Sequence, residues 1–249
     1  MPFETVKNGF LSNNALKIIA AALMVCDHAG MLLFPKMTVL RYIGRLAFPI
    51  FAYLIAEGAK HTKNFARYFL TMAGFATVIQ VGYYIFRRSL KMSVMVTFTL
   101  SLAIIYTLDL LKTAMFTKPA SNVRIAAFAM LFIGTVLIVA MIDRTVDLDY
   151  HFYGCLLPVF PSLLTTPKVE DPPEIFKILD TKLPRILAAA FGLLLLALNI
   201  GGRQIYGFLA LPLLLLYSER RGRLKMKYFF YVFYPLHLVI LYALSLLLK

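Results

Sequence analysis

Apolar residues run along this chain in blocks of about twenty, and short segments rich in lysine and arginine separate the blocks. A helix rises about 1.5 Å per residue, so about 20 apolar residues cross the hydrocarbon core of a bilayer, which is about 30 Å thick. The pattern therefore predicts an all-α fold, a polytopic transmembrane helical bundle with about nine spans. The expected spans lie at approximately 15–34, 38–57, 65–86, 93–111, 123–142, 150–165, 183–200, 203–217 and 228–248.

Two of the expected spans, 150–165 and 203–217, are short, so they could be tilted, re-entrant or merged with a neighbour. The longest polar segment runs from Thr165 to Lys182, and its Pro172 and Pro173 indicate a loop. This loop is too short for a domain of its own, so we expect one integral membrane domain over residues 1–249.

The composition excludes several other classes of protein. Hydrophobic residues make up 61% of the 249 residues and charged residues 15%, whereas a soluble domain has about half and about a quarter. A disordered chain and an ordinary cytosolic enzyme are therefore excluded, and so is an outer-membrane barrel, whose strands alternate apolar and polar residues. Cys26 and Cys155 fall in or beside apolar spans, so no disulfide framework is predicted.

The positive charge fits a membrane surface better than a nucleic acid. The formal net charge is +14, from 26 Lys and Arg against 12 Asp and Glu, and the basic residues lie at span ends, where anionic lipid headgroups account for them. With the N-terminus inside, seventeen of these bases fall in cytoplasmic segments and eight outside, while Arg45 lies within a span. This split favours an internal N-terminus and an external C-terminus. The first residues lack the features of a cleaved signal, so we expect the first span to act as an uncleaved insertion signal.

Ionisable residues inside the first two spans are the strongest functional signal. Such a residue costs about 2.5–3.5 kcal/mol on insertion scales and usually faces a partner or a wet cavity. Asp27 and His28 are adjacent, so on a helix they project about 100° apart, and Asp27 is poorly placed to orient His28. Arg45 lies at similar depth on the next span and is the better partner for Asp27, which leaves His28 to titrate or to accept a proton. The pair could also be a purely structural link between two helices.

Two further polar sites have structural alternatives as well. Glu57 and His61 lie four residues apart on one helical face and could meet directly, either as a helix-end pair or as part of a binding site. They offer two metal ligands without a third nearby in sequence, so no metal site is expected. His237 lies midway along the last span and follows Pro235, so its ring could merely satisfy a carbonyl that the proline kink frees.

Around these residues the sequence resembles the TraX family, whose members are inner-membrane proteins named for the factor that N-acetylates F-type conjugative pilin. The resemblance is carried by LKIIAAALMVCDHAGMLLFP and by LRYIGRLAFPIFAYLIAEGAKHTKNFARYFL. It returns in LPLLLLYSERRG, in KYFFYVFYPLHLVIL and more faintly in DLDYHFYG, in collinear order over most of the chain. The block from Asp27 to His61 is the most specific part and FYPLH is the next, while the segment from about Ser89 to Asp147 departs most.

The resemblance implies acyl transfer from acetyl-CoA to an amine or hydroxyl of a membrane or exported acceptor, in the bacterial cytoplasmic membrane. The acceptor could be a peptide N-terminus, a glycan or a lipid. Such a reaction needs a base for the attacking group and a cation or donor for the developing oxyanion. His28 fits the base and Arg45 fits the electrophilic role or a substrate clamp, with Asp27 fixing the guanidinium. His237 is a second donor or an alternative base.

Basic residues at the cytoplasmic end of the second span offer a rim for the phosphates of CoA, namely Lys60, Lys63 and Arg67, and Arg220, Arg221 and Arg223 form a competing rim. Tyr153 and Tyr234 lie in resembling segments and complete the candidate set. The catalytic candidates are thus Asp27, His28, Arg45 and His237, and the candidate substrate- or cofactor-binding residues are Glu57, His61, Lys63, Arg67, Tyr153 and Tyr234.

Two other classes of function remain open from the sequence. A small proton-coupled carrier could use His28, Asp27 and His237 as a relay, although no inverted repeat is visible. A non-catalytic assembly factor for a membrane peptide would need none of these side chains for chemistry.

Overall fold

The computed structural model describes residues 9–88, 91–220, 222 and 227–248, and the described chain is helical. It forms two compact units, one from Met1–Leu54 with Gly201–Lys249 and one from Ile55–Ile200. The expectation of one integral membrane domain stays a prediction, and the two units are considered in turn.

The first unit is organised around its N-terminal helix. Ser12 caps this helix by accepting a hydrogen bond from the Ala15 amide at 3.2 Å, and Leu16 and Met24 are among its buried residues. The helix contacts both the next helix in the chain and the C-terminal helix. The elements of this unit are α1 (Asn13–Leu32), α2 (Thr38–Gly44), the start of α3 (Ala47–His61), η1 (Gly202–Ala210), α11 (Leu211–Leu215) and α12 (Lys227–Leu247).

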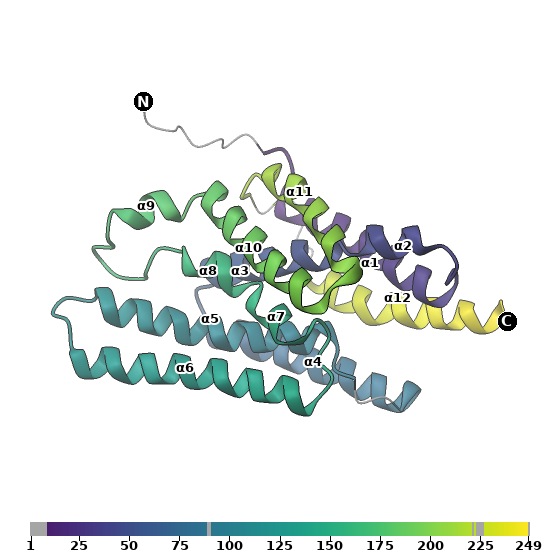
Figure 1. The fold of residues 1–249 in the computed structure, drawn as a ribbon, viewed down its shortest axis with the longest axis horizontal. Coiled ribbons are helices and arrows are strands. Elements are labelled where there is room, and N and C mark those ends of the chain that lie inside the picture. The colour runs from purple at the N-terminus through teal and green to yellow at the C-terminus, as the bar shows by residue number, and fades with distance from the viewer. Residues whose placement is uncertain (1–8, 89–90, 221, 223–226, 249) are drawn as a thin grey trace. The chain divides into compact units, whose positions relative to one another are not determined.

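The second unit holds the longest helices of the chain. Its elements are the end of α3, α4 (Phe65–Arg87), α5 (Val94–Phe116), α6 (Asn122–Thr145), α7 (His151–Leu156), α8 (Val159–Leu163), α9 (Ile175–Leu179) and α10 (Lys182–Ile200). Figure 1 shows α5 and α6 as a long hairpin, with α4 along α5. The short helices α7 and α8 pack on α10 and α5, where Ser101 donates a hydrogen bond to the Cys155 carbonyl at 2.8 Å.

The helix lengths support a multi-pass membrane protein, although with fewer spans than the sequence pattern predicts. Six described helical segments are long and apolar enough to cross a bilayer, at Asn13–Leu32, Thr38–His61, Phe65–Ile85, Val94–Phe116, Asn122–Thr145 and Lys182–Ile200. Helix α6 buries only Val139 and leaves its other residues exposed or half-buried, as expected for a helix that faces lipid. The C-terminal helix α12 is also apolar, with a described stretch of Val232–Leu247.

The prediction of nine spans is not supported, because three expected spans have no counterpart among the six described helices. One of them, 228–248, corresponds to α12, whose described apolar stretch is the shorter Val232–Leu247, and the other two are interrupted. The expected span 150–165 is divided into α7 and α8 at Pro158, since proline lacks the amide proton that a continuous helix needs. The expected span 203–217 is a 3₁₀ helix followed by the five-residue α11. The 3₁₀ helix begins at Gly202, and both Gly201 and Gly202 have positive φ. Neither piece is long enough to cross a bilayer on its own.

Candidate functional site

Asp27 lies at the contact between α1 and α2 in the first unit and pairs with two arginines. Arg45 Nη2 lies 3.0 Å from Asp27 Oδ1, so the ion pair expected from the sequence is confirmed. Arg41, which was not among the predicted site residues, places Nη1 2.8 Å from Asp27 Oδ2 and also donates to the Asp27 carbonyl at 3.0 Å. Its spacing of four residues before Arg45 was the available signal, because such residues share a helical face.

Local backbone features allow this cluster to form. Gly44 lies so close to Asp27 that a Cβ at position 44 would approach the Asp27 Cα to 2.6 Å, and α2 could not lie there with a larger residue. The helical segment predicted as one span breaks at Arg45 and Leu46, between α2 and α3. The guanidinium therefore extends from the end of a short helix back to α1. The Arg41, Arg45 and Asp27 side chains are 19%, 11% and 14% exposed, so the cluster is largely shielded from solvent.

The residue after Asp27 has a different partner, on α12. His28 Nδ1 lies 2.9 Å from His237 Nε2, and the ring centroids are 5.1 Å apart. His237 is buried, and its Nδ1 lies 3.0 Å from the Phe233 carbonyl. The Phe233 ring stacks on it with centroids 5.2 Å apart, and the Tyr234 ring meets it edge-on at 5.6 Å. The two histidines that the sequence offered as alternative bases are thus a hydrogen-bonded pair.

The contact to Phe233 bears on the structural interpretation of His237. A proline at position 235 removes the hydrogen bond to the carbonyl four residues earlier, at position 231. The His237 ring instead bonds to the carbonyl of Phe233, four residues before His237 itself. The His237 ring therefore does not satisfy the carbonyl that Pro235 leaves without its helical hydrogen bond.

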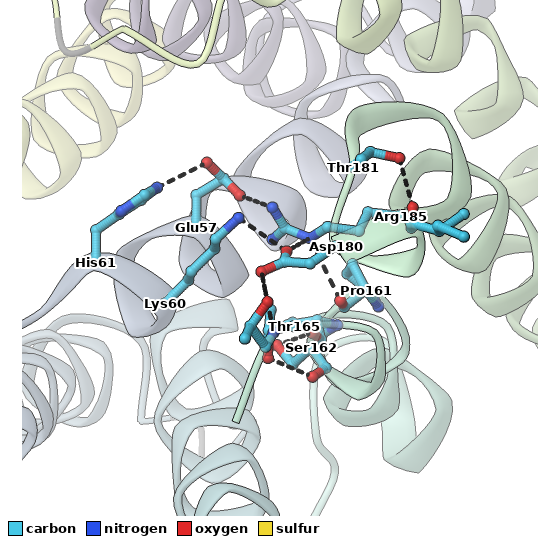
Figure 2. Close-up of polar contacts among 12 residues, drawn as sticks. Glu57, Lys60, His61, Pro161, Ser162, Thr165, Asp180, Thr181 and Arg185 are labelled. Carbon is cyan, nitrogen blue, oxygen red and sulfur yellow. Dashed lines mark hydrogen bonds and ion pairs between the residues drawn. The ribbon is translucent and has the colours of Figure 1, made fainter. Parts of the chain in front are cut away.

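A second polar cluster lies in the second unit around Glu57 (Figure 2). His61 Nε2 is 3.5 Å from Glu57 Oε2, which confirms the expected pair of residues four apart. The other carboxylate oxygen pairs with Arg185, a side chain with no exposed surface. Arg185 Nε also lies 3.7 Å from Asp180 Oδ1, and Lys60 Nζ lies 2.8 Å from the same oxygen. Figure 2 shows Glu57 between His61 and Arg185, and Asp180 between Lys60 and Arg185.

This network was not predicted from the sequence, although Asp180 lies in the expected loop from Thr165 to Lys182 and Arg185 follows that loop. No local pattern indicates it, because Asp180 pairs with Lys60 across 120 residues. Thr166 strengthens the link by donating to Asp180 Oδ2 from both its amide and its hydroxyl, each at 2.9 Å. The network thus anchors both ends of the loop between α8 and α10.

A buried lysine holds the start of the same loop. Lys112 Nζ donates to the Ser162 carbonyl at 3.1 Å, to Thr165 Oγ1 at 2.9 Å and to the Thr165 carbonyl. The Ser162 carbonyl lies in the last turn of α8 and the Thr165 carbonyl just after it, at a helix C-terminus, where a cation is favourable. Lys168 pairs with Asp109 at 3.1 Å. A cavity of about 180 Å³ lies beside these contacts, and its lining includes Lys60, His61, Asp109, Thr166, Lys168 and Asp180.

The other predicted binding residues lie in different surroundings. Lys63 and Arg67 are exposed around the start of α4, where Asn64 caps the helix by accepting from the Arg67 amide at 2.8 Å. Tyr153 is half-buried in α7 beside Phe152, with ring centroids 5.9 Å apart. In the competing rim, Arg220 is exposed, while Arg221 and Arg223 lie outside the described residues.

The first unit therefore brings together five of the predicted site residues, and the second unit contains the other five. Asp27, His28, Arg45, Tyr234 and His237 belong to the first unit, and Glu57, His61, Lys63, Arg67 and Tyr153 to the second. Over the described part of the chain, no group of three or more His, Cys, Asp and Glu side chains is placed to hold a metal ion.

Comparison with known proteins assigns the sequence to a family. The family model described as TraX protein matches residues 12–245. The chain is 26% identical to the probable fimbrial assembly protein FimC, serogroup H1, of Dichelobacter nodosus, over 91% of this chain and 92% of that protein. No solved structure matches the chain. Because the family model spans nearly the whole sequence, including both polar clusters, this multi-pass membrane protein belongs to the TraX family.

Proposed function

We propose that this protein is an integral membrane acyltransferase that moves an acetyl group from acetyl-CoA to an amine or hydroxyl of a membrane or exported acceptor. The observation that carries the proposal is the arrangement on α1, where consecutive residues present an arginine–carboxylate cluster and an imidazole pair within one compact unit. Acyl transfer needs these two chemical functions near one another. Ionisable groups on apolar helices are also costly to insert, which favours a functional role.

The reaction assigns a task to each group. An imidazole of the His28–His237 pair removes a proton from the acceptor as its nitrogen or oxygen attacks the thioester carbonyl carbon. The negative charge that develops on the carbonyl oxygen is stabilised by Arg45, which Asp27 holds together with Arg41. The carbon–sulfur bond then breaks, and the CoA thiolate leaves and takes up the proton from the imidazolium.

The acceptor and the membrane orientation belong to the same proposal. The fimbrial name of the relative from Dichelobacter nodosus favours a pilin-like peptide N-terminus as the first acceptor to test, ahead of a glycan or a lipid. The distribution of basic residues favours the bacterial inner membrane with the N-terminus inside, so acetyl-CoA arrives from the cytoplasm. Lys63 and Arg67 are exposed and positively charged, as CoA phosphates require, and Glu57, His61, Tyr153 and Tyr234 remain candidate binding residues.

The test is acetyl transfer by purified protein in nanodiscs. Radiolabelled acetyl-CoA is offered with a panel of peptides, amino sugars and aminolipids, and acceptor labelling is measured together with thiol release. We expect His28→Ala to lower turnover by at least about 100-fold and Arg45→Gln by a similar factor. Arg67→Ala should raise the KM for acetyl-CoA. His151→Ala is the matched control, because this exposed histidine pairs with Asp143 in the second unit. Absence of both acetyl-CoA binding and transfer in a folded, monodisperse sample overturns the proposal.

A second candidate function is a non-catalytic factor for fimbrial assembly, which is favoured by the relative's name alone. Fimbriation of cells that carry the His28→Ala variant separates the two functions. A scaffold keeps its function without the imidazole, whereas an acyltransferase loses acetylation of its acceptor while remaining in the membrane at normal abundance.

A further inference from the structure

The hydrogen bonds around His237 determine where its ring proton lies. A carbonyl oxygen can only accept a hydrogen bond, so the contact of 3.0 Å between His237 Nδ1 and the Phe233 carbonyl requires a proton on Nδ1. In a neutral imidazole the other nitrogen then carries a lone pair. His237 Nε2, which lies 2.9 Å from His28, is therefore an acceptor.

The same reasoning extends to His28. Its Nδ1 faces the His237 Nε2 lone pair at 2.9 Å, so Nδ1 must donate and must carry the proton of the neutral ring. The lone pair of His28 consequently lies on Nε2. We infer that His28 Nε2 is the base of the acyl transfer and that His237 is a positioning residue that fixes the tautomer of His28. This inference rests on the proposed acyltransferase function.

The surroundings of His237 suit a fixed role. His237 is 5% exposed. The Phe233 ring stacks on its imidazole, the Tyr234 ring meets it edge-on, and the Phe233 carbonyl accepts its hydrogen bond, so three groups hold the orientation of the ring. A flip of the ring would replace both nitrogens with carbons at their hydrogen-bonding positions. Burial of His237 also strengthens the hydrogen bond between the two rings, because the effective dielectric constant inside a protein is lower than in water.

The proton balance of the reaction follows from this arrangement. The acceptor nitrogen or oxygen forms a bond to the thioester carbon and gives its proton to His28 Nε2, so the ring becomes an imidazolium with both nitrogens protonated. Its Nδ1 proton remains in the hydrogen bond to His237, which stabilises the charge. When the carbon–sulfur bond breaks, the Nε2 proton passes to the CoA thiolate and the neutral tautomer is restored.

The geometry also distinguishes a base from a proton relay. A proton that passed through His28 to His237 would have to leave from His237 Nδ1, which faces the Phe233 carbonyl oxygen, a poor proton acceptor. The pair is therefore suited to hold one proton reversibly at His28, as acyl transfer requires.

The first test is independent of activity and uses the full chain in nanodiscs. The sequence contains four histidines, so ¹⁵N-histidine labelling gives four rings, which single Gln substitutions assign. At a pH where the rings are neutral, we expect both His28 and His237 in the Nδ1-protonated tautomer, which free histidine populates less. An Nε2-protonated tautomer at either ring overturns the inference. If the wild-type protein transfers acetyl groups in that case, the proposed function stands without it.

The second test compares two replacements of His237. The amide oxygen of His237→Gln can accept the hydrogen bond from His28 Nδ1, whereas His237→Leu fills similar space without an acceptor. We expect His237→Gln to keep kcat within about 10-fold and His237→Leu to lose at least about 100-fold with little change in KM. In the Ser-His-Asp triad, disturbing the orienting carboxylate lowers kcat by about 10⁴. Equal losses in the two variants contradict a positioning role. Correct tautomers without any acetyl transfer overturn the proposed function alone.

Discussion

Replacing Arg185 with methionine is the sharpest test of the buried network in the second unit. The guanidinium has no exposed surface and contacts Glu57, Asp180 and the Pro161 carbonyl. Methionine keeps much of the side-chain volume but leaves the Glu57 carboxylate, which is 2% exposed, without its buried cation. Breaking a buried ion pair by removing one partner costs about 3–5 kcal/mol, and we expect Arg185→Met to fall in this range.

The neighbouring cations reduce the loss of stability in Arg185→Met but do not abolish it. Lys60 remains 2.8 Å from Asp180, so one carboxylate keeps a close partner. His61 is 3.5 Å from Glu57 but is more than half exposed and carries charge only when protonated. Glu57→Gln in the Arg185→Met background removes the buried negative charge. The double variant should therefore be more stable than the sum of the single effects predicts, by about 0.5–3 kcal/mol.

A buried thiol provides the assay, since the chain has no tryptophan. Cys155 has no exposed surface, so a thiol-reactive fluorophore labels it on unfolding in a Cys26→Ala background. A loss of about 4 kcal/mol corresponds to a fall in Tm of about 8–16 °C for a chain of this size. The matched control is Arg124→Met, an exposed arginine at the start of α6, which should change stability by less than about 0.5 kcal/mol. Equal shifts for Arg185→Met and Arg124→Met would refute the reasoning.

Two further predictions concern packing and surface charge. Gly44→Ala places a Cβ against Asp27 and should destabilise the protein by about 1–3 kcal/mol and lower acetyl transfer, whereas Gly74→Ala, where a Cβ meets open space within α4, should leave turnover unchanged and should not lower Tm, since alanine favours a helix over glycine by up to about 1 kcal/mol. In the exposed loop pair, the hydrogen bond from Lys118 holds the pKa of Asp171 below its ordinary value. Lys118→Gln should raise this pKa in a carboxyl NMR titration. A carboxyl whose pKa is lower in the folded than in the unfolded state stabilises the fold at pH values above its unfolded pKa, and this stabilisation is lost as the pH falls through its folded pKa. Both side chains are more than four-fifths exposed, so the stabilisation is small and Lys118→Gln should not change Tm at neutral pH.

The sequence predicted the long helices well because their signals are local. Helices α1, α4, α5, α6 and α10 match the expected spans to within a few residues, apart from a longer C-terminal end of α5. The length of each apolar run determines the length of the helix, and capping side chains such as that of Asn64 mark where some of the helices begin. The apolar runs at 150–165 and 203–217 are shorter, and hydropathy alone did not register that Pro158 and the Gly201–Gly202 pair interrupt helical hydrogen bonding.

The same distinction applies to the polar clusters. The Glu57–His61 pair followed from helical spacing, and the Asp27–Arg45 pair followed from similar depth on consecutive helices. Arg185 had no such signal, because its partners come from α3 and from the loop before α10. A buried charge with distant partners is defined by tertiary packing, which no window of sequence contains.

The histidine pair illustrates how this limit affects the assignment of function. From the sequence, His28 was judged by its neighbour Asp27 and His237 by Pro235, so the two rings competed for one role. In the structure they are 2.9 Å apart and share one hydrogen bond, so alanine at either position would remove activity and would not separate base from positioning residue. The Phe233 carbonyl breaks this symmetry, because it bonds to one ring and fixes the direction of both protons. The Phe233 carbonyl thus determines which histidine is the base and which is the positioning residue. Only substitutions of His237 that keep or remove a hydrogen-bond acceptor for His28 Nδ1 can test these roles.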